Sequence, residues 1–139
     1  MNNFRTAFGI VVVIEALTFL LAGLAHLGRP IPLGFAVISE PRIVPATVVE
    51  SLCGLLLLFS AYPILTGKRW SWTIAVIAHG FSLVGVLLGI AALALGGGPR
   101  TDLNDLYHRV MLVVLVGALI FLFSRPAKEA LMRSGDTRQ

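Results

Sequence analysis

Charged residues are scarce in this sequence. Of its 139 residues, only 13% are charged, whereas 57% are hydrophobic. A soluble domain normally carries about one quarter charged residues, because polar side chains must cover its surface. A chain with so few charges has too little polar surface to face water on all sides. The composition therefore excludes an ordinary soluble domain and favours a protein surrounded by lipid.

Cysteine and metal-ligand motifs are also missing. Cys53 is the single cysteine, so the chain has neither an intramolecular disulfide nor a CxxC redox pair. This argues against a thiol–disulfide enzyme. The three histidines form no HxxxH, CxxCH or HExxH motif. The isoelectric point near 10 comes without a basic face of the kind that binds nucleic acid, and we expect no nucleic-acid partner.

Long apolar segments are what the sequence does contain. They cover residues 6–28, 43–65, 70–95 and 103–124, and breaks rich in glycine, proline or basic residues separate them. About 20 apolar residues in a helix cross the hydrocarbon layer, and each segment reaches that length. The pattern predicts an all-α fold, a four-helix transmembrane bundle with up-down topology. Residues 1–139 would form one integral membrane domain in the lipid bilayer, with a cytoplasmic tail at 125–139.

Lysine and arginine predict the orientation of this bundle. If the N-terminus is inside, seven basic residues lie on the cytoplasmic side and four on the other. That bias favours two cytoplasmic termini, in an inner (plasma) membrane, for a multi-pass protein. The first apolar segment is longer than a typical signal-peptide core and has a weakly basic flank, so we expect it to be retained.

Ionisable residues inside the spans are the candidate functional groups. Charge in hydrocarbon is costly, so such residues usually face the bundle interior and often serve function. Helical spacing places Glu15 past mid-membrane and predicts a polar pocket that opens outward, with the first and fourth helices as neighbours. The ligand- or proton-handling candidates are Glu15, Glu50, His79, His26, Asp105 and His108.

Several chemistries fit these residues. His26 and His108 approach the same depth and are the candidates for a metal or haem, although no ligand motif supports them. Glu15, Glu50 and His79 are spaced through the membrane as a proton relay would be. The structural alternative is that histidines and carboxylates only pair across the bundle. Gly85 and Gly89 form a GxxxG pattern, which would allow close helix packing within the bundle or in a homo-oligomer.

Two segments carry a resemblance to a known family. Residues 15–27, EALTFLLAGLAHL, and residues 48–58, VVESLCGLLLL, resemble the first two helices of DoxX-like proteins. The resemblance covers about the first 65 residues. It implies a small four-helix membrane protein, a role for Glu50, and a role for His26, where the family more often has lysine. Some DoxX-like proteins belong to quinone-linked oxidoreductase assemblies.

These observations lead to one functional expectation and three alternatives. We expect a subunit or accessory of a quinone-linked membrane redox system that binds a quinone-like or other amphipathic molecule in the polar pocket. The alternatives are a proton-coupled small transporter, a metal- or haem-binding membrane protein, and a scaffold without chemistry. The sequence leaves open whether the protein is an enzyme.

Overall fold

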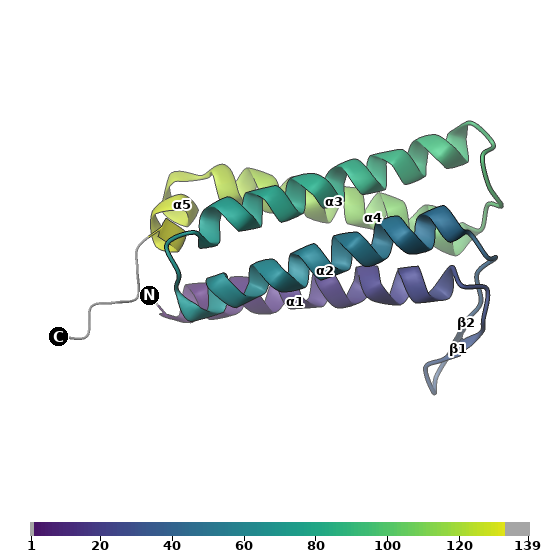
Figure 1. The fold of residues 1–139 in the computed structure, drawn as a ribbon, viewed down its shortest axis with the longest axis horizontal. Helices are drawn as coiled ribbons and strands as arrows, with labels where there is room; N and C mark the ends of the chain where they lie inside the picture. Colours follow the sequence, from purple (N-terminus) through teal and green to yellow (C-terminus); the bar gives the residue numbers. More distant parts are fainter. Residues whose placement is uncertain (1, 133–139) are drawn as a thin grey trace.

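The fold is a bundle of four long antiparallel helices, followed by a short fifth helix (Figure 1). The computed structural model describes residues 2–132. Its elements are α1 (Asn2–Ala25), β1 (Ile31–Pro32), β2 (Val37–Ile38), α2 (Val44–Thr66), α3 (Ser71–Ala94), α4 (Asp102–Phe123) and α5 (Arg125–Met132). The predicted all-α, four-helix bundle is confirmed, with its helices alternating in direction along the chain.

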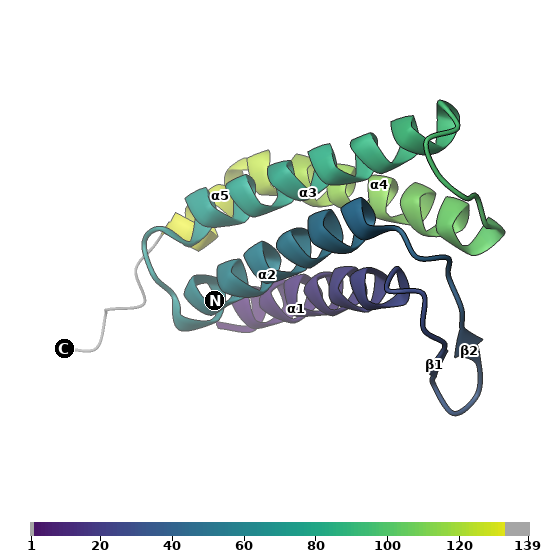
Figure 2. The ribbon, with the colours of Figure 1, turned by 45° about the vertical axis from the view of Figure 1, so that its right-hand side comes forward.

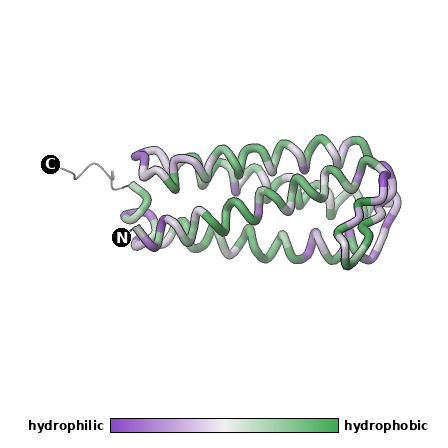
Figure 3. Tube along the Cα trace, turned by 90° about the horizontal axis from the view of Figure 1, so that it is seen from below, coloured by the Kyte–Doolittle hydropathy of each residue, from purple (hydrophilic) through white to green (hydrophobic). Residues whose placement is uncertain are grey.

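The four long helices are long and apolar enough to cross a membrane, at 22 to 24 residues each. Large apolar side chains cover their outer surfaces, among them Ile14, Leu88 and Val113, which are more than half exposed. Hydrophilic residues gather at the two ends of the bundle, while its length is mostly hydrophobic (Figure 3). In water this surface would be unfavourable, and in a bilayer it matches its solvent.

Local sequence explains where the helices begin and end. Pro45 lies in the first turn of α2, where its missing N–H removes no helical hydrogen bond. Gly67 ends that helix in the left-handed conformation with φ 73°, which glycine adopts without steric cost. The Thr101 side chain caps α4 by accepting a hydrogen bond from the Asn104 N–H at 3.1 Å. These three residues place the start and end of α2 and the start of α4 within a few positions of the predicted boundaries.

Small residues bring the helices close together. A Cβ at Gly54 of α2 would lie 2.9 Å from the Ala16 carbonyl oxygen of α1. A Cβ at Gly85 of α3 would lie 2.9 Å from Cys53 Sγ, and Gly89 faces His108 of α4. The GxxxG pair of α3 therefore packs against helices of its own bundle, which was one of its two expected uses.

The connection between α1 and α2 forms a small β-hairpin. Ile31 pairs with Ile38 and Pro32 with Val37 in antiparallel register. The hairpin projects from the end of the bundle opposite to α5 (Figure 2). The chain then returns to the bundle, where Glu40 accepts a hydrogen bond from the Thr101 hydroxyl at 2.7 Å. This contact ties the connection to the start of α4.

The first part of the predicted cytoplasmic tail is a helix packed on the bundle. Ala127 and Leu131 of α5 are fully buried. Arg5 of α1, itself buried, donates to the Ala130 carbonyl oxygen from Nε at 2.9 Å and from a terminal nitrogen at 2.8 Å. A cation at the last carbonyls of a helix is favourable both as a donor and for the helix dipole. Arg133 and Arg138, which the orientation argument also used, lie outside the described residues.

The Arg5 contact makes a testable contribution to stability. We expect Arg5→Met to lower the free energy of unfolding by about 2 kcal/mol, because charge-assisted hydrogen bonds to buried carbonyls are lost. Arg69→Met is the matched control, since Arg69 is an exposed cation at the same end. Thermal unfolding in detergent measures both. Equal stability of the two variants would show that Arg5 does not hold α5.

Candidate functional site

Glu15 and His79 form a buried pair between α1 and α3. His79 Nε2 lies 3.0 Å from Glu15 Oε2, and the imidazole is completely buried. His79 Nδ1 lies 2.7 Å from the Ala75 carbonyl oxygen, which can only accept, so Nδ1 carries a proton. One further proton then lies between Nε2 and Oε2. The pair is either two neutral groups or an ion pair, and in both forms its net charge is zero.

All three histidines of the chain are oriented in this way. His108 Nδ1 lies 2.9 Å from the Asn104 carbonyl oxygen, and His26 Nδ1 lies 3.5 Å from that of Pro41. A proton on Nδ1 leaves Nε2 of each neutral imidazole with its lone pair. The short contacts of His79 and His108 thus favour a proton on Nδ1 and direct Nε2 away from the backbone, whereas the contact of His26 is at the outer limit of a hydrogen bond.

A second carboxyl group, Glu50 of α2, lies in the opposite half of the bundle from α5. His26 Nε2 is 3.7 Å from Glu50 Oε1, a distance that fits an ion pair but is too long for a hydrogen bond. Glu50 is 5% exposed, and neither of its carboxyl oxygens has a hydrogen-bond partner among the described residues. An unpaired buried polar group costs free energy, so this carboxyl group is poised to accept hydrogen bonds.

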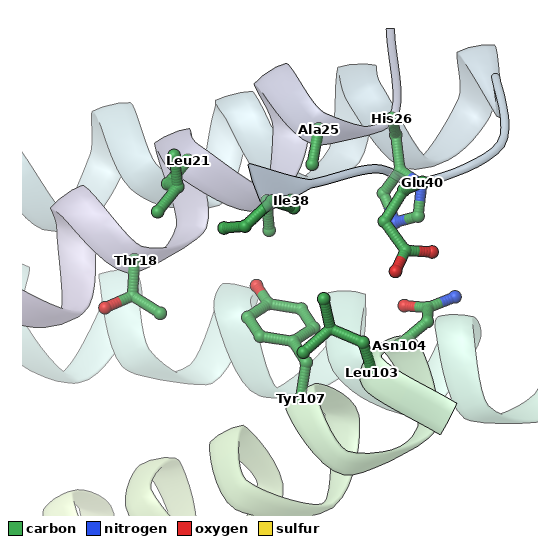
Figure 4. Close-up of a pocket in the computed structure, with 10 residues that line it drawn as sticks. Thr18, Leu21, Ala25, His26, Ile38, Glu40, Leu103, Asn104 and Tyr107 are labelled. Carbon is green, nitrogen blue, oxygen red and sulfur yellow. The ribbon is translucent and has the colours of Figure 1, made fainter. Parts of the chain in front are cut away.

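One cavity of about 190 Å³ lies between α1 and α4, beneath the hairpin (Figure 4). His26 and Glu40 lie on one wall, and Asn104 and Tyr107 project from α4 on the other. Its remaining lining is mostly apolar and includes Leu21, Ala25 and Ile38 among others.

A larger cavity, of about 320 Å³, lies between the ends of α2, α3 and α4. Glu50 and His108 line it, and small or apolar residues of α2 and α3 form most of its surface. Asn104 lines both cavities and therefore lies between them. Gly89 makes room for the imidazole, because a Cβ there would lie within van der Waals overlap of His108 Nε2.

The structure thus divides the predicted site residues into three groups. His26, Glu50 and His108 come together around the two cavities. Glu15 and His79 pair with each other and line neither cavity. Asp105 lines neither and binds Arg100, whose Nε lies 2.7 Å from Oδ2; this hydrogen bond raises the pKa of the guanidinium.

Three residues at the cavities were not among the sequence candidates. Asn104 and Tyr107 are polar but not charged, and the search for ionisable groups within spans passed over them. Glu40 is buried although it belongs to the connection between α1 and α2. Its sequence neighbours are Pro41 and Arg42, directly before the second span, and they do not indicate a buried side chain. Its contact with Thr101 depends on the tertiary fold.

The cavities suit a small molecule better than a metal ion. Within residues 2–132, no three histidine, cysteine or acidic side chains converge on one point. The polar groups that do gather are hydrogen-bonding side chains and the Glu50 carboxyl group, set in mostly apolar walls. Apolar walls with a small number of polar groups are typical of small-molecule pockets.

Comparison of the chain with protein-family models, curated proteins and solved structures gave no match. The DoxX-like resemblance therefore stays a prediction.

The fit between Gly89 and His108 can be tested by adding one methyl group. We expect Gly89→Ala to displace the imidazole and to lower the unfolding temperature, since an overpacked core typically loses about 1–3 kcal/mol. Gly80→Ala is the control on the same helix, because a Cβ there meets nothing within 4 Å. NMR of the histidine ring protons reports the displacement. An unchanged His108 signal in Gly89→Ala would contradict this packing.

Proposed function

We propose that the two cavities bind the head of a quinone-like amphipathic molecule and that the protein is a subunit or accessory of a membrane redox system. The fold supports this proposal by bringing together His26, directly after α1, with Glu50 of α2 and His108 of α4. The cavities adjoin spans whose outer faces are apolar, so a ligand with a lipid tail has a suitable environment beside its head.

The mostly apolar lining of the cavities favours a ligand with an apolar body, such as a ring. Ligand pockets are typically about 300–1,000 Å³ and mostly apolar, with a few polar groups that fix orientation. The larger cavity, about 320 Å³, is at the lower end of that range. It has room for a head group, and a long tail would have to extend into the bilayer.

The observation that carries the proposal is that neither oxygen of the buried Glu50 carboxyl group has a hydrogen-bond partner among the described residues. A carboxyl group that is 5% exposed and lacks hydrogen-bond partners among residues 2–132 is stabilised by any donor that enters the cavity beside it. A ring hydroxyl in the larger cavity would supply that donor. In this proposal the chain binds and orients the head group and exchanges a proton at Glu50, and electron transfer belongs to a partner protein.

The distribution of basic residues supports a finer proposal on orientation. Arg5, Lys68, Arg69, Arg125 and Lys128 lie at the end of the bundle that carries α5. Under the positive-inside rule this end faces the cytoplasm of an inner (plasma) membrane. The two cavities would then open toward the opposite side.

Ligand binding provides the direct test of the proposal. We expect protein purified in mild detergent to bind a short-tailed benzoquinol, and Glu50→Gln to weaken the binding at least about tenfold because a charge-capable acceptor is lost. Isothermal titration calorimetry measures the affinity.

Asp105→Asn is the matched control for this experiment. It makes the same acid-to-amide change on α4, at a side chain that binds Arg100 and lines neither cavity. We expect its affinity to equal that of the natural chain. The proposal fails if the protein binds no quinol or quinone, or if Glu50→Gln and Asp105→Asn behave alike.

The Glu15–His79 pair favours a second candidate function, proton-coupled transport. A hydrogen-bonded acid–imidazole pair can exchange its shared proton without creating net charge in the membrane. The pair is buried inside the bundle, where Glu15 of α1 reaches His79 of α3. A transporter would bind a proton at this pair on its way between the two sides of the membrane.

Proton uptake into liposomes tests this second candidate. We expect a potassium diffusion potential to drive proton entry through the natural protein, detected by a trapped pH dye, and Glu15→Gln to abolish it by removing the titrating carboxyl group. Asp102→Asn, at the exposed start of α4, should leave the rate unchanged. Liposomes that keep their pH as protein-free vesicles do would rule this function out.

A further inference from the structure

The β-hairpin between α1 and α2 carries no polar side chain. Residues 31–38, IPLGFAVI, are all apolar or glycine. Phe35, next to the tip, is 90% exposed, and Val37 and Leu33 are 64% and 37% exposed. A contiguous exposed apolar surface usually marks contact with another protein or with a membrane. The hairpin therefore needs a partner that covers apolar side chains.

The base and the tip of this hairpin are both well defined. The Ile43 N–H donates to the His26 carbonyl oxygen at 3.0 Å, so the chain returns to the point where it left α1. At the tip, Gly34 has φ 86°, and the Leu33 N–H donates to the Ala36 carbonyl oxygen at 2.8 Å. A two-stranded hairpin is only marginally stable in water unless its apolar side chains are covered.

The hairpin adjoins the lipid-facing surface of the bundle. It runs sideways from α1, across the bundle axis, at the level of the helix ends (Figure 1, Figure 3). Leu24 in the last turn of α1 and Leu27 just after it are about half exposed, so the apolar surface of the span continues to the hairpin. Arg29 and Arg42 flank the hairpin in the sequence and are exposed. Their guanidinium groups suit the phosphates of lipid headgroups.

We infer that this hairpin is a membrane anchor, whose Leu33, Phe35 and Val37 side chains insert at the boundary between headgroups and acyl chains. Interfacial segments bury apolar side chains about 5–10 Å into this boundary. Lipid suits the hairpin better than a protein partner does, because a segment without polar side chains has no side-chain hydrogen bonds that would specify one. The unpaired backbone edges of the strands exclude a deeper position, because open sheet edges do not occur in hydrocarbon.

The anchor also fixes one wall of a cavity at the membrane surface. Ile38 of β2 lines the cavity between α1 and α4, and so does Glu40, which is hydrogen-bonded to Thr101. A hairpin held in the interface keeps this cavity beside the lipid, from which an amphipathic molecule can enter sideways. The inference goes beyond the proposed function and holds whichever molecule the cavities bind.

Paramagnetic broadening of NMR signals tests the inference on the natural chain in phosphatidylcholine nanodiscs. A lipid with a nitroxide near its headgroup broadens amide signals at the interface, and a water-soluble gadolinium chelate broadens those in water. We expect the nitroxide lipid to broaden the Phe35 amide signal severalfold more than the chelate does, as at Leu24. Gly98, in the connection between α3 and α4 at the same end, is the aqueous reference and should show the opposite order.

Two substitutions at Phe35 test the cause of the insertion. Phe35→Asp places a charge there and should lift the hairpin into water, so that the chelate broadens its signal in place of the nitroxide lipid. Phe35→Leu is the matched control and should keep the natural pattern. Both variants should fold, because the Phe35 side chain is 90% exposed and exposed side chains contribute little to packing.

Three results would overturn the inference. Broadening of Phe35 in the natural chain mainly by the chelate would place the hairpin in water. Protection of Phe35 from both reagents would show that protein, such as a second copy of this chain, covers it. An unchanged pattern in Phe35→Asp would show that apolar contact with lipid does not hold the hairpin in place.

Discussion

The need to pair every polar group without water governs this bundle. In hydrocarbon an unpaired donor or acceptor costs several kcal/mol, so each ionisable side chain within a span must find its partner in the protein. The three histidines do so in the same way, by placing Nδ1 on a backbone carbonyl. That arrangement leaves every Nε2 free to face a second group. The polar chemistry of the bundle follows from what each Nε2 then meets.

The two ends of the bundle meet this need differently. At the end that carries α5, Arg5 and Ser71 donate to carbonyl oxygens of α5, and Trp72 Nε1 donates to the Leu122 carbonyl oxygen at 2.8 Å. Donors and acceptors are matched there, and α5 covers the end of the bundle. At the other end, the polar groups line two cavities and several acceptors remain unmatched. One end is built for packing, and the other has room for a ligand.

The sequence predicts the helices more completely than it predicts the site. The four spans follow from apolar length, and Pro45, Gly67 and Thr101 explain their limits through known backbone preferences. Candidate residues could be chosen because charge within hydrocarbon is rare. Their partners could not be chosen, because the rotation of each helix about its axis depends on contacts such as Gly54 on Ala16 and Gly89 on His108. Asp105 was expected in the pocket and instead binds Arg100, since one turn of α4 separates a cavity face from a surface face.

The contrast between the two buried glutamates bears most directly on function. Glu15 and Glu50 are buried to the same extent, and each faces the Nε2 atom of a histidine. Glu15 reaches hydrogen-bond distance from His79, at 3.0 Å, whereas Glu50 stays 3.7 Å from His26. The first pair is hydrogen-bonded and lines neither of the two cavities. The second borders the cavities, and neither Glu50 oxygen has a hydrogen-bond partner among the described residues. A carboxyl group that only set helix register is expected to pair as Glu15 does, so the separation of Glu50 from His26 is the feature that supports the proposed ligand.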